Sequence, residues 1–528
     1  MAAILELALA AAVLPPVGPN RSAIGSPLIG KGQRVEEAPF PGDTEPTLLP
    51  PAAREGLGAL YAGNLATAEA AFRRARDAAP SDPAGPYGLA LVAWWRVFLS
   101  RGNAAAVEAC DGYLKEALSV AEKVRPRSPR SAFYKGRVYA TRAQLRLQEK
   151  RWMAAAQDAR RMRSTFNKVL KQQPDLTDAA LWPGLYDLFA DRAPGAVKVL
   201  GFFFFLPRGN EQRGLRRLQQ AAAGPGPFAT EAKLYQVGVQ YWAKNDPAAA
   251  VDELEALAAR FPSNGYLHLF LAYGRLEAFG DAAGAHFDLS RAIKLAGNET
   301  LLLWSARMMD ARVALLAGLV PEALADLQAL EDRPPEMLAD QVPQAFILRG
   351  HIEGQLGEVE RSRQTLERVL ANPAWSRFHG AARSERSRPH DQLEAEIFRA
   401  NLEGQRQAAS GHREAARESL EAVLARYPDN PQTRYRLAEM DLASGRYGEA
   451  AAAFEAVARE EPEKPTWLAP WSWVKAGWCH DALDNRQAAE AAYRDALQYK
   501  HRYDEGAVRA AERFLRRPYR RPPASVPR

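Results

Sequence analysis

Cysteine, histidine and long apolar runs are scarce in this chain. Its 528 residues include 2 cysteines and 8 histidines, which excludes a disulfide-stapled fold and a cysteine-rich zinc module. The sequence contains no HExxH, CxxC or G-x-S-x-G motif, and no Ser, His and Asp residues stand in a recognisable triad order. The sequence therefore predicts a non-catalytic protein that requires neither a cofactor nor a metal.

The N-terminal residues 1–50 combine an apolar segment with a linker rich in proline and glycine. Residues 7–17 have the length and apolarity of a signal-peptide core, but no basic residue precedes them and Glu6 interrupts the segment. The pattern slightly favours export to the periplasm. An apolar N-terminal helix in a cytoplasmic protein and a misassigned start codon are the alternatives. No other segment is long enough to cross a bilayer.

The formal net charge of +7 conceals an uneven distribution. Residues 122–171 carry 15 basic and 3 acidic side chains, and residues 513–528 carry six arginines and no acid. The remainder of the chain is therefore acidic, which argues against a protein that coats nucleic acid. The two basic regions instead suit an acidic partner, phosphate groups or an anionic surface.

A frame of small and apolar residues recurs at a spacing of 34 residues. It begins at a glycine or asparagine, continues with a small residue at +5 and a large apolar residue at +9, and ends near a proline at +17. The residues that we assign to packing between helices are Gly63, Ala68, Phe72, Gly411, Ala416, Leu420, Gly445, Ala450 and Phe454. Glycine or asparagine ends a first helix and proline ends a second, so each frame predicts a helical hairpin.

This frame resembles that of the tetratricopeptide repeat superfamily, over roughly residues 51–100 and 228–512. The resemblance implies an all-α fold, an α-solenoid built as a right-handed superhelix of about nine to eleven stacked hairpins. Gly214, Leu215, Leu218 and Ala221 also give a local likeness to the tetratricopeptide repeat protein 39 family.

Breaks in the frame suggest a division into segments. After the N-terminal residues 1–50, we expect the segments to be a half with longer, degenerate repeats (51–223), a hinge (224–227), a central array (228–371), an arginine-rich exposed loop (372–392), a C-terminal array (393–512) and a basic tail (513–528).

In arrays of this superfamily the first helix of each pair lines the concave surface. The resemblance therefore implies a groove in the C-terminal units, lined by Asn401, Gln405, Gln432, Tyr435, Glu439, Trp471, Trp478 and Asp481. Amides and aromatic rings suit an extended peptide, so we expect a scaffold that binds an unidentified protein or peptide. Asn401, Gln405 and Arg436 do not reproduce the set with which chaperone-binding members clamp a terminal carboxylate.

Basic residues in 122–171 recur on one helix face and its neighbour. The candidates are Lys135, Arg142, Arg146, Lys150, Arg160, Arg163 and Lys171. Exposed arginines whose stems cover apolar surface are the simpler interpretation. The alternative function is an envelope- or lipid-associated assembly factor that binds a membrane surface, without spanning it, through this patch and the Phe202–Phe205 run. Nucleic acid is the less favoured partner.

Overall fold

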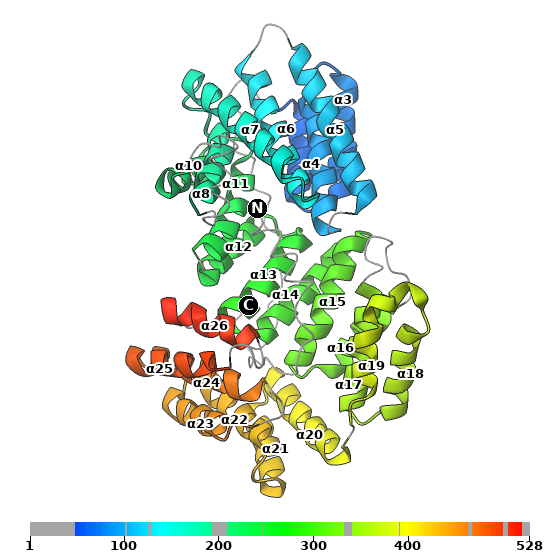
Figure 1. Cartoon of the computed structure of the whole chain (residues 1–528), viewed down its shortest axis with the longest axis vertical. Helices are drawn as coiled ribbons and strands as arrows, with labels where there is room; N and C mark the ends of the chain where they lie inside the picture. Colours follow the sequence, from blue (N-terminus) through cyan, green and yellow to red (C-terminus); the bar gives the residue numbers. More distant parts are fainter. Residues whose placement is uncertain are drawn as a thin grey trace. The chain divides into compact units, whose positions relative to one another are not determined.

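The computed structural model describes residues 48–100, 103–124, 128–192, 209–244, 246–331, 341–389, 391–462, 467–499 and 505–519. These residues are mainly α-helical and contain no β-strand. They form two compact units, residues 48–267 and 268–519 (Figure 1). The boundary between the two units falls at Leu267, and the hinge expected at residues 224–227 stays a prediction. Residues 1–47, the Phe202–Phe205 run and the end of the basic tail lie outside the described residues.

The first unit is a row of helical hairpins. Its elements are α2 (Pro51–Tyr61), α3 (Leu65–Ala78), α4 (Ala84–Leu99), α5 (Ala104–Lys123), α6 (Pro129–Gln148), α7 (Trp152–Gln172), η1 (Thr177–Ala180), α8 (Leu181–Arg192), α10 (Glu211–Ala223), α11 (Ala229–Gly238), the short π-helix η2 (Val239–Ala243) and α12 (Pro247–Arg260). Each helix packs mainly against the next one along the chain, as α6 does against α7.

The second unit continues the same arrangement with more regular repeats. Its elements are α13 (Gly265–Phe279, which begins in the first unit), α14 (Ala282–Ala296), α15 (Thr300–Leu316), α16 (Val320–Glu331), α17 (Val342–Gln355), α18 (Val359–Leu370), η4 (Pro373–Phe378), α19 (His379–Arg386), α20 (Gln392–Ala409), α21 (Arg413–Arg426), α22 (Pro431–Ala443), α23 (Tyr447–Arg459), α24 (Leu468–Ala482), α25 (Arg486–Leu497) and α26 (Glu505–Arg516). The helices are coloured from green to red in Figure 1.

The hairpin turns have a shared backbone geometry. The first helix of several pairs ends at a residue with positive φ, which glycine adopts without steric cost; these glycines are Gly63, Gly280, Gly318, Gly357, Gly411 and Gly445. Lys150 and Asp484 occupy the same position in two further hairpins, with φ of 59° and 57°. The turn geometry therefore extends to α6–α7, where a lysine stands in place of glycine.

Small residues on the first helix accommodate the large +9 residue of the second. A Cβ atom on Gly56 would lie 2.9 Å from the ring of Phe72, and one on Gly404 would lie 2.8 Å from Leu420. A Cβ on Gly88, in the following hairpin, would lie only 2.0 Å from Phe72. The +9 side chain thus fills the space inside its own hairpin as well as the space against the next one.

First and second helices differ in how much of their surface is covered. On α24, twelve of the 15 residues are buried, so this first helix is enclosed on most sides. On α25 the buried residues form a single stripe of Ala489, Ala492, Tyr493 and Ala496. The first helices α4, α15 and α17 are enclosed in the same way, whereas α20 is more exposed. We call the first helix of each pair inner and the second, which buries one face, outer.

Residues 372–392, expected to be an exposed loop, contain two helical elements instead. The 3-10 helix η4 and helix α19 occupy most of the segment, and α19 packs against α17 and α18 through the buried Ala382. His351 bonds to Glu385, with 2.7 Å between Nδ1 and Oε1, which anchors α19 further. The segment breaks the 34-residue period because it adds a helix, not because it lacks one.

Candidate functional site

The eight groove candidates lie on the inner helices of the second unit. Asn401 and Gln405 belong to α20, Gln432, Tyr435 and Glu439 to α22, and Trp471, Trp478 and Asp481 to α24. All of them are buried except Gln432, which is half-buried. The sequence placed them on a solvent-lined groove, whereas the structure gives seven of them contacts within the protein. They belong to successive inner helices and do not form one open surface.

Tyr435 and Asn401 serve the packing between hairpins. Tyr435 is 0% exposed and its ring lies edge-on to Phe454 and Trp467, with centroids 5.2 and 5.4 Å away. The amide oxygen of Asn401 accepts a hydrogen bond of 2.9 Å from the hydroxyl of Thr433 on the next inner helix. Both residues therefore join neighbouring hairpins of the second unit. They do not occupy the open groove positions that we assigned to them from the sequence.

A buried charged cluster joins α22 to α24. Arg436 donates to Glu439 at 2.6 Å, and Lys475 Nζ lies 3.6 Å from the same carboxylate. Lys475 also lies over the ring of Trp478, 4.3 Å from its centroid. Burial lowers the pKa of Lys475, and the neighbouring Glu439 works in the opposite direction. Two cations and one anion thus share this part of the inner layer.

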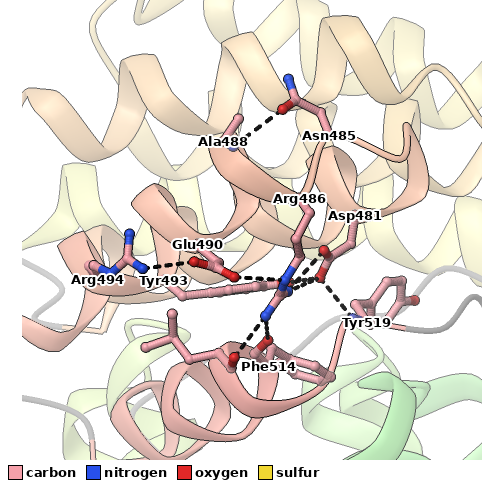
Figure 2. A network of polar contacts seen from close by, with 10 residues as sticks. Asp481, Asn485, Arg486, Ala488, Glu490, Tyr493, Arg494, Phe514 and Tyr519 are labelled. Carbon is pink, nitrogen blue, oxygen red and sulfur yellow. Dashed lines mark hydrogen bonds and ion pairs between the residues drawn. The ribbon is translucent and has the colours of Figure 1, made fainter.

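The C-terminal segment covers Trp478 and Asp481. The ring of Tyr519 stacks on Trp478 with centroids 4.7 Å apart and an interplanar angle of 7°, and Phe514 meets the same indole edge-on. The backbone N–H of Tyr519 donates to Asp481 Oδ2 at 2.8 Å (Figure 2). An aromatic ring and a backbone amide, the two groups expected of a bound peptide, are here supplied by the chain itself.

Arg486 and Asp481 hold this segment in place (Figure 2). Arg486 donates 2.8 Å hydrogen bonds to the carbonyls of Phe514 and Leu515, the last turn of α26, and also pairs with Asp481. The hydroxyl of Tyr493 donates to Asp481 at 2.7 Å. Burial raises the pKa of Tyr493, and the Asp481 charge raises it further, so this hydroxyl remains a donor.

The basic tail assigned to residues 513–528 begins inside a helix. Residues 513–516 form the last turn of α26, and Arg513 bonds to the carbonyl and carboxylate of Glu277 on α13. The apolar positions of α26, Ala507, Ala511 and Phe514, are buried. Ala507 and Ala511 belong to the array expected from the sequence, and Phe514 continues their helical spacing into the segment assigned to the tail.

Two buried aspartates form ion pairs with arginines of the predicted basic patch. Arg142 makes two hydrogen bonds of 2.8 Å to Asp158, and Arg146 also binds this carboxylate. Arg163 lies 3.4 Å from Asp187, which Arg213 and Arg217 also contact. Arg142, Arg146 and Arg163 are therefore bound to carboxylates within the fold, which corrects their assignment to a surface patch. Lys135 is half-buried, whereas Lys150, Arg160 and Lys171 are exposed.

The frame residues that were assigned to packing lie at the hairpin turns and between helices. Gly63, Gly411 and Gly445 have φ between 77° and 83°. The buried members are Ala68, Phe72, Ala416, Leu420, Ala450 and Phe454. Both cysteines are buried, and burial raises each thiol pKa to about 12.

Within the part of the chain that the structure describes, no group of three or more His, Cys, Asp or Glu side chains is arranged to hold a metal ion. No helix there combines the length and apolarity needed to cross a bilayer.

A family model agrees with the repeat assignment over part of the chain. A tetratricopeptide repeat family model matches residues 407–469, and no curated protein sequence matches significantly. Similar solved structures include the human IFIT1 dimer with PPP-AAAA (15% identity, 85% of this chain and 82% of that chain, TM-score 0.31). Others are yeast Tom70 (11%, 87% and 91%, 0.29) and the TPR domain of P58(IPK) (18%, 74% and 96%, 0.22).

These likenesses are low in identity and in TM-score, so they carry no argument about activity. The likeness of residues 214–221 to the tetratricopeptide repeat protein 39 family stays a prediction. In each of the two units the described residues form stacked helical hairpins, and residues 407–469 match the tetratricopeptide repeat family model.

Proposed function

We propose that this chain is a non-catalytic scaffold that binds an extended segment of another protein along the inner helices of its second unit. The contacts of Tyr519 carry the proposal. Its ring stacks on Trp478 and its backbone N–H bonds to Asp481, the combination of aromatic area and main-chain pairing by which grooves hold extended peptides. A partner segment with an aromatic side chain would make the same two contacts.

The proposal implies that Tyr519 and a partner segment compete for Trp478. Trp478 is 3% exposed, so a partner reaches it only when Tyr519 moves away. Binding then has to offset the loss of the internal contacts, which lowers the apparent affinity of the scaffold. Removing the ring of Tyr519 is therefore expected to strengthen partner binding, whereas removing the ring of Trp478 weakens it.

Selection of peptides from a random library on the full-length chain tests the proposal. Calorimetric titration of a selected peptide should show roughly tenfold weaker binding to Trp478→Ala, the loss expected for one aromatic anchor. Tyr519→Ala should bind several-fold more tightly. Trp152→Ala serves as the matched control, because Trp152 is an exposed tryptophan on α7, far along the chain. Circular dichroism establishes that each variant is folded.

Two results would contradict the proposal. One is the enrichment of no peptide over a denatured sample of the same chain. The other is a selected peptide whose affinity is the same for the wild-type chain, Trp478→Ala and Tyr519→Ala. Asp481→Asn provides a second test with less change in packing, since it removes charge from the acceptor of the Tyr519 amide.

A further inference from the structure

Helix α7 presents a continuous cationic stripe to solvent. Most of its exposed positions recur every three or four residues, which places them on one face; these are Met153, Gln157, Arg160, Arg161, Ser164, Lys168 and Lys171. The only acidic residue of α7 is Asp158, which is buried on the opposite side and bound by Arg142 and Arg146. The exposed face of the helix therefore carries positive charge and no negative charge.

Three cations of this stripe have no ion-pair partner in the part of the chain that the structure describes. Among the described residues, no carboxylate lies within ion-pair distance of Arg160, Lys168 or Lys171, while Arg161 lies 3.7 Å from Asp158. Helix α7 spans 21 residues, which corresponds to about 30 Å. Arg160 and Lys171 are 11 positions apart, which corresponds to about 16 Å, so the three cations without a described partner lie along the middle and C-terminal part of the helix.

Exposed apolar side chains lie at one end of the stripe. At the α6–α7 turn, Trp152 is 65% exposed, Met153 58% and Leu147 38%. The turn is defined by Lys150, whose φ is 59°, and by a 3.1 Å hydrogen bond from Arg146 to the carbonyl of Ala154. Exposing large apolar groups at the tip of a hairpin costs free energy in water. We therefore expect another surface to bury these side chains.

We propose that the exposed face of α7 and its apolar tip dock the protein on an anionic lipid membrane. Tryptophan favours the headgroup region of a bilayer, and basic side chains gain attraction to a negatively charged leaflet. The stripe would lie along the headgroups while Trp152, Met153 and Leu147 enter the interface. This contact uses none of the inner-helix residues of the proposed scaffold function.

A membrane surface fits these observations better than a nucleic acid. Both partners would engage Arg160, Lys168 and Lys171 through phosphate groups. An unpaired base would stack on Trp152 but would leave the aliphatic Leu147 and Met153 uncovered. A bilayer interface accommodates all three apolar side chains together with the cations.

Vesicle flotation with the full-length chain tests the proposal. The probes are vesicles of phosphatidylcholine alone and vesicles that contain about one third phosphatidylserine, at low and at high salt. The chain should float with the anionic vesicles at low salt only. Lys168→Gln with Lys171→Gln should reduce this fraction by about tenfold or more, and Trp152→Ala with Met153→Ser should reduce it several-fold.

Matched controls separate the stripe from general positive charge. Arg291→Gln with Lys294→Gln removes two exposed cations at the same spacing on α14, and it should leave flotation unchanged. Equal binding to both kinds of vesicle would overturn the proposal, as would anionic binding that the stripe and tip variants do not reduce. Stripe-dependent binding to a single-stranded RNA oligonucleotide without vesicle binding would overturn it in favour of nucleic acid.

A fluorescent label reports whether the tip enters the interface. The native cysteines are both buried, so Met153→Cys can be labelled selectively with a polarity-sensitive dye. Anionic vesicles should shift its emission to shorter wavelength. The same dye on Phe287→Cys, an exposed site on α14, should show no shift. A shift at both sites, or at neither, contradicts insertion of the α6–α7 tip.

Discussion

The side chain of Asn264 donates a hydrogen bond of 2.8 Å to the backbone carbonyl of Tyr61, 203 residues earlier in the chain. Its amide oxygen also accepts from the N–H of Tyr266, so one residue begins helix α13 and holds the first hairpin turn. The rings of Tyr61 and Phe261 lie 6.1 Å apart beside it. The first and last hairpins of the first unit, residues 48–267, are therefore in direct contact.

Gly63 tests this long-range contact. Its φ is 82°, and an added Cβ would lie 2.8 Å from Oδ1 of Asn264. Gly63→Ala should lower the free energy of unfolding by about 1–2 kcal/mol from backbone strain and by a further 1–3 kcal/mol or so from overpacking. Gly445→Ala has a similar φ of 77° and no neighbour within 4 Å, so it should show the first loss alone. Urea denaturation of both variants gives the difference, and equal losses would argue against the contact.

Gly88 tests the packing between successive hairpins. A Cβ there would lie 2.0 Å from the ring of Phe72, which is buried, so Gly88→Ala should destabilise the chain by about 1–3 kcal/mol. Phe72→Leu should recover part of this loss, giving a favourable coupling of at least ~0.5 kcal/mol in a double-mutant cycle. Gly112→Ala, at an open helical position, should instead stabilise by about 0.5–1 kcal/mol. Additive effects of the changes at 72 and 88 would contradict this packing.

Asp326 gives the second unit a specific pH dependence. Burial raises the pKa of its carboxyl from 3.8 to about 7, with a further contribution from Asp310, while Arg307 and His286 oppose the shift. The folded state retains a proton that the unfolded chain releases near pH 4. The contribution of Asp326 to the free energy of unfolding is therefore complete below about pH 4 and is lost as the pH rises from about 4 to about 7. Asp326→Asn should flatten this change in urea midpoints, whereas the exposed Asp429→Asn should not.

The two cysteines should be unreactive in the folded chain. Cys110 and Cys479 are 0% exposed, and burial raises the pKa of each thiol to about 12, so very little thiolate forms at neutral pH. A colourimetric thiol reagent should detect almost no thiol in the native protein and both thiols in urea. Rapid reaction of either cysteine without urea would show that its inner helix opens readily.

The hairpins were predictable because each one depends on residues close together in the sequence. The glycine at a turn, the small residue and the large +9 residue lie within one 34-residue period, and Gly56 with Phe72 or Gly404 with Leu420 meet as this spacing requires. The turn at Lys150 escaped the pattern because a lysine there takes the backbone conformation usually left to glycine.

Contacts between distant repeats could not be predicted from one sequence. Arg137, which is fully buried, pairs with Glu231 ninety-four residues later and lies 3.7 Å above the ring of Phe228. No local pattern marks such partners. The same reason explains the groove and patch assignments: a count of charges does not show that Asp158 binds Arg142 and Arg146, and helix position does not show that Tyr519 covers Trp478.

Hydrogen–deuterium exchange with and without a selected peptide tests the central claim that the inner helices of the second unit bind an extended segment. We expect slower amide exchange in α22 and α24, where Gln432 and Trp478 lie, and faster exchange in residues 505–519, which the peptide releases from Trp478 and Asp481. Slower exchange confined to the outer helices α21, α23 and α25, with residues 505–519 unchanged, would contradict the claim.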